Sequence, residues 1–230
     1  MGGSGIDSSD IDSSGIDGSG TRSARTSATR EALLSVAERL YAEEGLHTVS
    51  NRHVSEAAGQ GNNAAVAYHF GSKADLVRAI VDRHSGAVEE TRTEMVEHVG
   101  ESERLEDWVS CLIRPYTDHL ATLGVPSWYG RFNVQLLADP SLRTIVYEQA
   151  TDSVALRSTL DGLDRSLPNL PLDVRRARRE MVRSLMMHVC AEKELEFSQQ
   201  HPERPPSWAD CGTDLIDATV GLWRAPVSRR

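Results

Sequence analysis

Residues 59–76 combine residue types that can contact DNA, at a spacing that fits one short structural unit. Their sequence is GQGNNAAVAYHFGSKADL. It predicts a sharp turn, a very short helix that ends in Tyr-His-Phe, and the start of a further helix. Because Val66 and Phe70 lie four residues apart, we expect both to pack inward. A short helix carried by two others is a common way to place side chains in the DNA major groove. The side chains left facing outward are Asn63, Ala64, Ala67, Tyr68 and His69.

Each candidate contact residue has a chemistry that suits a base edge or a phosphate. Asn63 can bond adenine through two atoms, while Tyr68 and His69 can serve bases or phosphates. Arg52 suits a phosphate or a base edge, and Ser50 suits a phosphate. A lysine stands in the first turn of the next helix, beside free backbone N–H groups that favour an anion. The predicted DNA-binding residues are Ser50, Arg52, Asn62, Asn63, Ala64, Tyr68, His69 and Lys73.

Helices on either side must position this unit. Apolar residues recur at helical spacing from Leu33 to Tyr41, with Thr29 as the expected N-cap and Gly45 just past the end. After the short helix, residues 72–75 read Ser-Lys-Ala-Asp, a capping box that begins a new helix.

Between these lies a second predicted helix, over residues 51–58. Ser50 is its expected cap, Val54 and Ala57 its buried face, and Gly59 its stop. This helix and the short one that follows would form the two halves of a helix-turn-helix.

Residues 29–76 resemble the DNA-binding domain of the TetR family of transcriptional regulators. The resemblance is specific because three helices, the turn and the lysine of the fourth helix all coincide in the right order. It implies an all-α fold, with a helical ligand-binding and dimerisation domain after the DNA-binding domain. The matching segments are Glu43-Glu44-Gly45, Ser50-Asn51-Arg52-His53-Val54, Glu56-Ala57-Ala58-Gly59 and Tyr68-His69-Phe70-Gly71-Ser72-Lys73, followed by Leu76.

The sequence departs from the family pattern at two places. The turn Gln60-Gly61-Asn62-Asn63 has one residue more than is usual in the family. Ala67 stands where members of the family often have an aromatic residue that contacts phosphate. We therefore expect DNA docking that differs slightly from that of the family, and an operator preference that relatives do not determine.

Charge and composition agree with a regulator that must release DNA. The 230-residue chain has a formal net charge of −9, which disfavours non-specific binding to DNA. Residues 1–20 carry four Asp and no basic residue, whereas residues 21–80 carry seven Arg or Lys against six Asp or Glu. The predicted DNA-binding part is thus the least acidic part of the chain.

Other classes of protein find little support in the sequence. Cys111, Cys190 and Cys211 are far apart and lack a Cys-x-x-Cys spacing, so we expect reduced cysteines and no metal site. No apolar run approaches the ~18 residues of a membrane span, and no signal peptide is visible, so we expect a cytoplasmic protein without a membrane partner. Because no nucleophile elbow, phosphate loop or His-Glu-x-x-His motif occurs, we expect neither an enzyme nor a cofactor.

The chain divides into three predicted regions. Residues 1–26 form a disordered tail, because their first part contains too little apolar surface to fold. Residues 27–75 form the DNA-binding domain, and residues 76–225 form the ligand-binding and dimerisation domain. The arginines between residues 21 and 30 can be interpreted as a solvated linker or as an arm that enters the minor groove.

The larger domain is predicted to contain helices only. The expected helices cover residues 72–99, 103–123, 127–137, 139 to about 166, 173–199 and 207–223. The basic run over residues 175–179 is interpreted as a solvated face, and His119 and His188 as core or surface histidines.

Aromatic residues concentrate in the middle helices of the larger domain. The resemblance implies a ligand pocket there, and the other interpretation is that these residues fill the core. Candidate pocket residues are Trp108, Cys111, Tyr116, Trp128, Phe132, Leu136 and Met181.

The last two helices are amphipathic and need a partner surface. In TetR-like proteins the corresponding helices pair with a second subunit as a four-helix bundle, so the resemblance implies a homodimer. Candidate interface residues are Met181, Leu185, Val189, Trp208, Leu215 and Leu222.

These observations lead to one main hypothesis. The chain is expected to be a TetR-like transcriptional regulator, a dimeric repressor that binds a palindromic double-stranded operator and is released by a small, largely apolar molecule. One alternative is a DNA-binding regulator that activates transcription or is controlled by a protein partner. A remote alternative is a helical enzyme.

Overall fold

The computed structural model describes residues 18–167, 169–199 and 207–228. These residues form ten α-helices and no strand, so the prediction of an all-α fold is confirmed. Within the same ranges, no helix has both the length and the apolar character needed to cross a lipid bilayer. The helices are α1 (Gly18–Glu44), α2 (Asn51–Ala57), α3 (Ala65–Phe70), α4 (Lys73–Val99), α5 (Leu105–Thr122), α6 (Tyr129–Ala138), α7 (Thr144–Asp152), α8 (Val154–Ser166), α9 (Leu172–Gln199) and α10 (Trp208–Arg224).

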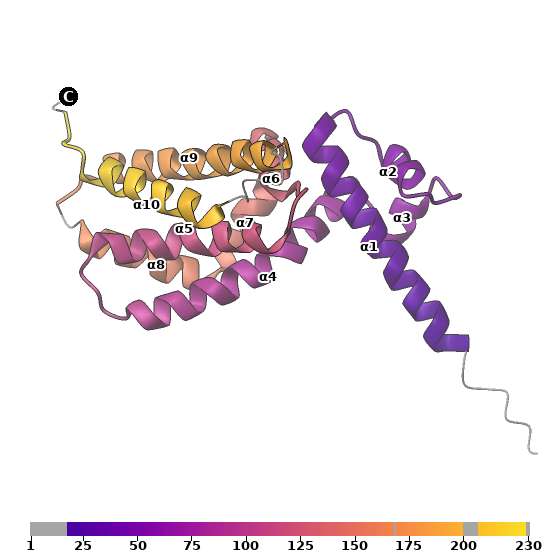
Figure 1. The fold of residues 1–230 in the computed structure, drawn as a ribbon, viewed down its shortest axis with the longest axis horizontal. Helices are drawn as coiled ribbons and strands as arrows, with labels where there is room; N and C mark the ends of the chain where they lie inside the picture. The colour runs from indigo at the N-terminus through magenta and orange to yellow at the C-terminus, as the bar shows by residue number, and fades with distance from the viewer. Residues whose placement is uncertain (1–17, 168, 200–206, 229–230) are drawn as a thin grey trace, which may run out of the picture.

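The helices form a small head and a larger body (Figure 1). α1, α2 and α3 lie at one end of the molecule, and α4 runs from beside them into the body that α5 to α10 complete. α1 also packs against α6 of the body. Within the body, α5 packs on α4, α8 and α10, and α6 packs on α9. A movement of α4 or α6 would therefore be transmitted directly to the head, because both helices pack against α1.

Local signals fix several helix ends of the head where the sequence predicts them. Ser72 Oγ accepts from the Asp75 N–H, and the Asp75 carboxylate accepts from the Ser72 N–H, which confirms the capping box of α4. Ser50 caps α2 through its side chain alone, which accepts from the His53 N–H. Gly45 and Gly59 take φ values of 87° and 68°, a region that residues with a Cβ avoid.

The first helix begins earlier than the sequence predicts. α1 starts at Gly18, so residues 18–26 of the predicted tail are helical and Thr29 lies inside the helix. Residues 23–28 are exposed and thus show no apolar stripe, although Ala and Arg favour a helix. The segment interpreted from the sequence as a solvated linker or a basic arm is therefore a continuation of α1. Residues 1–17 lie outside the described residues.

The single helix predicted from Asp139 to about residue 166 is instead two helices. Asp139 Oδ1 accepts from the Ser141 and Leu142 N–H groups at 2.8 and 3.2 Å, and so closes a turn before α7. Ser153 lies between α7 and α8, and its Oγ caps α8 by accepting from the Leu156 N–H at 2.9 Å. The apolar spacing runs through this break, which is why periodicity did not reveal it.

Candidate functional site

The start of α2 presents polar side chains held by short-range contacts. Ser50 Oγ accepts from the His53 N–H at 3.1 Å. Arg52 is exposed, and its Nε donates to Glu56 at 2.7 Å across one helical turn. Exposed ion pairs of this kind contribute little to stability. Arg52 can therefore exchange Glu56 for a phosphate at small cost.

A buried serine that the sequence analysis did not select positions α3 against α2. Ser55 Oγ donates to the Asn51 carbonyl at 3.0 Å and accepts from the Val66 N–H at 3.4 Å. Val54 and Ser55 form the buried face of α2, whereas Ala57, predicted to be buried, is exposed. A small hydroxyl residue at this position gives no apolar signal, so only the packing of the two helices reveals its role.

The outer side of α3 is displayed as the sequence predicts. Asn63, Ala64, Ala67 and Tyr68 are exposed, and His69 is half-buried. Tyr68 is 80% exposed, and its ring lies edge-on to His69 with centroids 5.0 Å apart. Asn62 Oδ1 accepts from the Ala64 N–H at 2.9 Å and so orders the turn that leads into α3.

Lys73 has protein partners at the position where the sequence predicts a phosphate. Its Nζ donates to the Val49 carbonyl at 2.7 Å and also to the Leu46 carbonyl, both in the loop between α1 and α2. Burial lowers the pKa of Lys73. The anion predicted at the start of α4 is the carboxylate of Asp75, in the capping box. In this structure Lys73 thus ties the loop to α4.

The arginines of α1 lie along the helix that supports α3. Arg25 and Arg30 are exposed, and the Arg30 guanidinium stacks 4.8 Å from the centroid of the Phe70 ring. This contact joins α1 to the end of α3. A minor-groove arm of the kind considered from the sequence would need these residues to be extended, and they are helical.

A buried polar cluster joins the head to the body. Glu38 of α1 is 6% exposed and His84 of α4 is 4% exposed. His84 Nε2 lies 2.9 Å from Glu38 Oε2, and His84 Nδ1 lies 2.9 Å from His119 Nε2 of α5. The Tyr129 ring of α6 stacks on the His84 ring with centroids 3.8 Å apart. Burial, with a smaller effect of His84, lowers the pKa of His119 to about 4. Side chains from four helices therefore meet at this joint.

Comparison with known protein families matches the segment that forms the head. A family model described as bacterial regulatory proteins, tetR family, matches residues 33–80, which run from α1 into α4. The match identifies the head of this chain as the DNA-binding domain of the TetR family of regulators. Members of this class are regulators of transcription and not enzymes. No curated protein matches the sequence.

Two solved structures show that the TetR-type fold extends over the body as well. A transcriptional regulator from Aquifex aeolicus VF5, described as TerR/AcrR family, shares 19% identity, with a TM-score of 0.50 over 83% of this chain and 96% of its own. The TetR-family regulator PfmR from Thermus thermophilus shares 17% identity, with a TM-score of 0.50 over 86% of this chain and 99% of its own. At these identities the likeness is one of fold.

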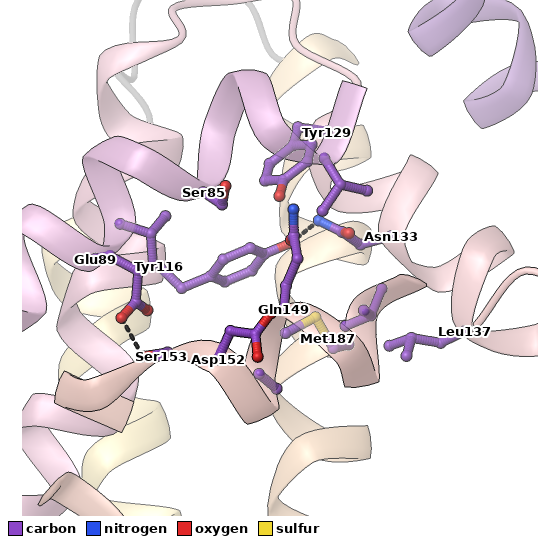
Figure 2. A pocket seen from close by; sticks show the side chains of 14 residues that line it. Ser85, Glu89, Tyr116, Tyr129, Asn133, Leu137, Gln149, Asp152, Ser153 and Met187 are labelled. Carbon is purple, nitrogen blue, oxygen red and sulfur yellow. Dashed lines mark hydrogen bonds between the residues drawn. The ribbon is translucent and has the colours of Figure 1, made fainter. Parts of the chain in front are cut away.

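The body of the chain contains a cavity of about 370 Å³ among α4, α6 and α7, which we call the polar cavity (Figure 2). Its apolar wall includes Val81, Val88 and Met187. Asn133 Nδ2 donates to the Tyr116 hydroxyl at 3.0 Å inside it. Burial raises the pKa of Tyr116 well above its ordinary value and that of Tyr129 to about 12, so both phenols are neutral. The other polar groups that line it are Ser85, Glu89, Gln149, Asp152 and Ser153.

A second cavity, of about 320 Å³, lies among α4, α5, α8 and α9, and we call it the leucine cavity. It adjoins the polar cavity, because Val146 and Met187 line both. Arginines supply its polar groups, namely Arg92, Arg179 and Arg183. Its apolar wall includes Leu112, Leu160, Leu163, Met186 and Trp223.

Of the residues that the sequence analysis placed in a pocket, only Tyr116 lines the polar or the leucine cavity. Four others are core residues that are at most 1% exposed: Trp108, Cys111, Phe132 and Leu136. Trp128 instead lies at the joint with the head, where its Nε1 donates to Glu43 at 3.1 Å. Met181 is 55% exposed on the outside of α9. The core interpretation of the aromatic residues therefore describes two of the four candidates, Trp108 and Phe132.

The predicted interface residues also divide into two groups. Trp208 and Leu215 are 6% and 3% exposed because they pack inside their own chain, so they are not available to a second subunit in this conformation. Met181 is exposed, and three further residues are half-buried: Leu185, Val189 and Leu222. Of the two histidines, His119 belongs to the buried joint, and exposed His188 contacts the Ser184 carbonyl.

Proposed function

We propose that this regulator is a ligand-responsive repressor that binds a palindromic operator as a dimer. The exposed outer side of α3 supports major-groove binding, since a tyrosine that is 80% exposed offers a large surface to a partner. We assign base or phosphate contact to the outward residues of α3 and its turn, with α2 contributing at its start: Ser50, Arg52, Asn62, Asn63, Ala64, Tyr68 and His69. Lys73 would act mainly by holding the loop ahead of α2.

The ligand response is supported by the contacts that link the polar cavity to the head. Tyr129 lines the polar cavity and stacks on His84, which in turn contacts Glu38 of the head at 2.9 Å. A molecule that displaces the Tyr129 ring must therefore disturb the contact between α4 and α1. The effector needs only a differential affinity for the two arrangements, and a coupling of about 1–3 kcal/mol is typical.

The outer face of α9 supports a dimer. Met181, Leu185, Val189 and Leu195 recur along it at helical spacing, and Met181 and Leu195 are 55% and 41% exposed. A two-fold dimer would present two α3 helices to successive turns of a palindromic operator. Light scattering of the purified chain tests the dimer, and Met181→Glu together with Leu195→Glu should shift it to a monomer.

The experiment that tests the proposal is a titration of the chain against the intergenic DNA upstream of its own coding sequence, followed by fluorescence anisotropy at several salt concentrations. We expect saturable binding whose affinity falls steeply with salt. Absence of binding at any salt concentration would refute the proposal. A chain that binds this DNA but is not released by any small molecule would instead indicate control by a protein partner, or an activator.

A further inference from the structure

The leucine cavity contains hydrogen-bond donors that no acceptor in the described chain satisfies. Trp223 lines the cavity and is 2% exposed, and its buried Nε1–H has no hydrogen-bond partner among the described residues. The buried Nε–H of Arg179, which also lines the cavity, has none either. Buried donors without a partner are rare in folded proteins. Since both groups are donors, the missing partner is an acceptor.

The α9 side of the leucine cavity also has an excess of positive charge. Asp164 pairs with both Arg175 at 3.1 Å and Arg179 at 2.6 Å, so one carboxylate faces two guanidinium groups. Arg183 has no ion pair within the described part of the chain. Among the described residues that line the cavity, Glu180 is the one acid, and it is exposed. This edge therefore attracts an anion.

Arg92 adds a positive group on the opposite side of the cavity. It is 6% exposed, its Nε donates to the Cys111 carbonyl at 3.3 Å, and it pairs with Glu89. Glu89 lines the polar cavity and not the leucine cavity. Burial lowers the pKa of Arg92 to about 10, so it remains charged at neutral pH.

We propose that the leucine cavity binds an amphipathic carboxylate, an aliphatic acid with an extended chain. Its carboxylate would accept hydrogen bonds from Arg179, Arg183 and Trp223. Hydrogen bonds between a carboxylate and a guanidinium group are charge-assisted and therefore stronger than neutral ones. Its chain would lie against Leu160, Leu163 and Met186, where burial of apolar surface drives binding. The α9 wall from residue 179 to residue 187 rises by about 12 Å, which suits an elongated molecule. This inference rests on the proposed function only in taking that acid as the effector. The leucine cavity adjoins the polar cavity, where Tyr129 lies, through Val146 and Met187.

The test is isothermal titration of the full chain, without DNA, with three ten-carbon probes that differ in the head group. Decanoate should bind once per chain, about tenfold or more tighter than decanol, because decanol lacks the charge. Decyltrimethylammonium, which cannot accept a hydrogen bond, should bind more weakly still. Equal binding of decanoate and decanol, a preference for the cation, or no binding of decanoate would each overturn the proposal.

Variants locate the binding site. Arg183→Gln should weaken decanoate about tenfold and leave decanol unchanged, because only the acid uses the charge. Arg176→Gln, on the same helix and absent from the cavity lining, is the matched control and should not affect either probe. Trp223→Phe keeps an aromatic ring but removes the N–H, and should weaken decanoate by several-fold. If decanoate bound Arg183→Gln as tightly as wild type, the assignment would be wrong.

Failure of this inference and failure of the proposed function give different results. A chain that binds its upstream DNA but not decanoate refutes the acid alone. A chain that binds decanoate but no DNA refutes the proposed function alone. Release of the DNA by decanoate, with about tenfold more decanoate needed for Arg183→Gln, would support both.

Discussion

The surface of α2 and α3 and the cavities of the body differ in how the chain builds them. The former uses residues within one short stretch, and its polar side chains are exposed and held by neighbours two to four positions away, as in Ser50 with His53 and Asn62 with Ala64. The polar cavity is lined by residues as distant in sequence as Val81 and Met187. An exposed surface can thus be built from a short segment of the chain, whereas a cavity requires several helices that are distant in the sequence.

This difference implies that the two regions respond in opposite ways to substitution. Changes in the head surface should reduce DNA affinity and leave stability nearly unchanged. Changes at residues that hold the helices of the body together should mainly reduce the free energy of unfolding. Four substitutions test that contrast, ordered by the expected change in the free energy of unfolding.

The largest loss is expected for Glu194→Ala. Glu194 of α9 is 2% exposed, and its carboxylate accepts from the N–H groups of Gly130 and Arg131 at 3.0 Å and from Ser127 Oγ at 2.9 Å. It also pairs with the Arg131 guanidinium at 3.3 Å. Its removal should lower the free energy of unfolding by about 3–5 kcal/mol in chemical denaturation. Glu192→Ala, exposed on the same helix, is the control. Similar losses for the two variants would contradict the role of Glu194 as acceptor for the first N–H groups of α6.

A smaller loss is expected for Gly162→Ala. A Cβ at Gly162 would lie 2.1 Å from the Trp108 ring, which is 1% exposed and cannot move freely. Overpacking of this kind costs about 1–3 kcal/mol, measurable as a lower denaturation midpoint. Gly86→Ala in α4 meets nothing within 4 Å and should instead stabilise by up to about 1 kcal/mol. Equal effects of the two variants would show that the α5–α8 contact is loose.

The buried cluster of Glu38, His84 and His119 should make the stability of the protein depend on pH. Because the pKa of His119 falls from its ordinary 6.5 to about 4 in the fold, the unfolded chain binds this proton first as the pH decreases. The contribution of His119 to the free energy of unfolding should therefore decline between pH 6.5 and 4, by at most about 1.4 kcal/mol per unit. Denaturation curves of His119→Gln should have a flatter pH dependence than wild type in that window. His188→Gln, at a position outside the joint, should retain the wild-type slope.

The smallest change in stability is expected for Tyr68→Ala. Because Tyr68 is 80% exposed, its loss should alter the free energy of unfolding by less than about 0.5 kcal/mol. The affinity for the operator should nevertheless decrease by about tenfold, the lower range for loss of a good DNA contact. Tyr147→Ala, an exposed tyrosine of α7, should leave DNA affinity unchanged. A Tyr68 variant that binds DNA like wild type would remove α3 from the interface.

The sequence by itself determined the helices whose ends depend on neighbouring residues. The capping box of Ser72 and Asp75, the Ser50 cap and the stop at Gly59 act within four residues, so each can be recognised in the sequence. The outward display of Tyr68 follows from the inward spacing of Val66 and Phe70. The break at Ser153 was missed, because apolar spacing continues across it.

Only the tertiary structure decided which side chains support the sites and where the cavities lie. Glu38 meets His84 across 46 residues, and Glu194 reaches Gly130 across 64. Trp108 and Phe132 share the composition expected of a pocket, yet they fill the core, while the open volume lies beside Tyr116 and Arg183. The physical reason is that caps are set by the backbone near each residue, whereas a cavity is the space left when distant helix faces pack against one another.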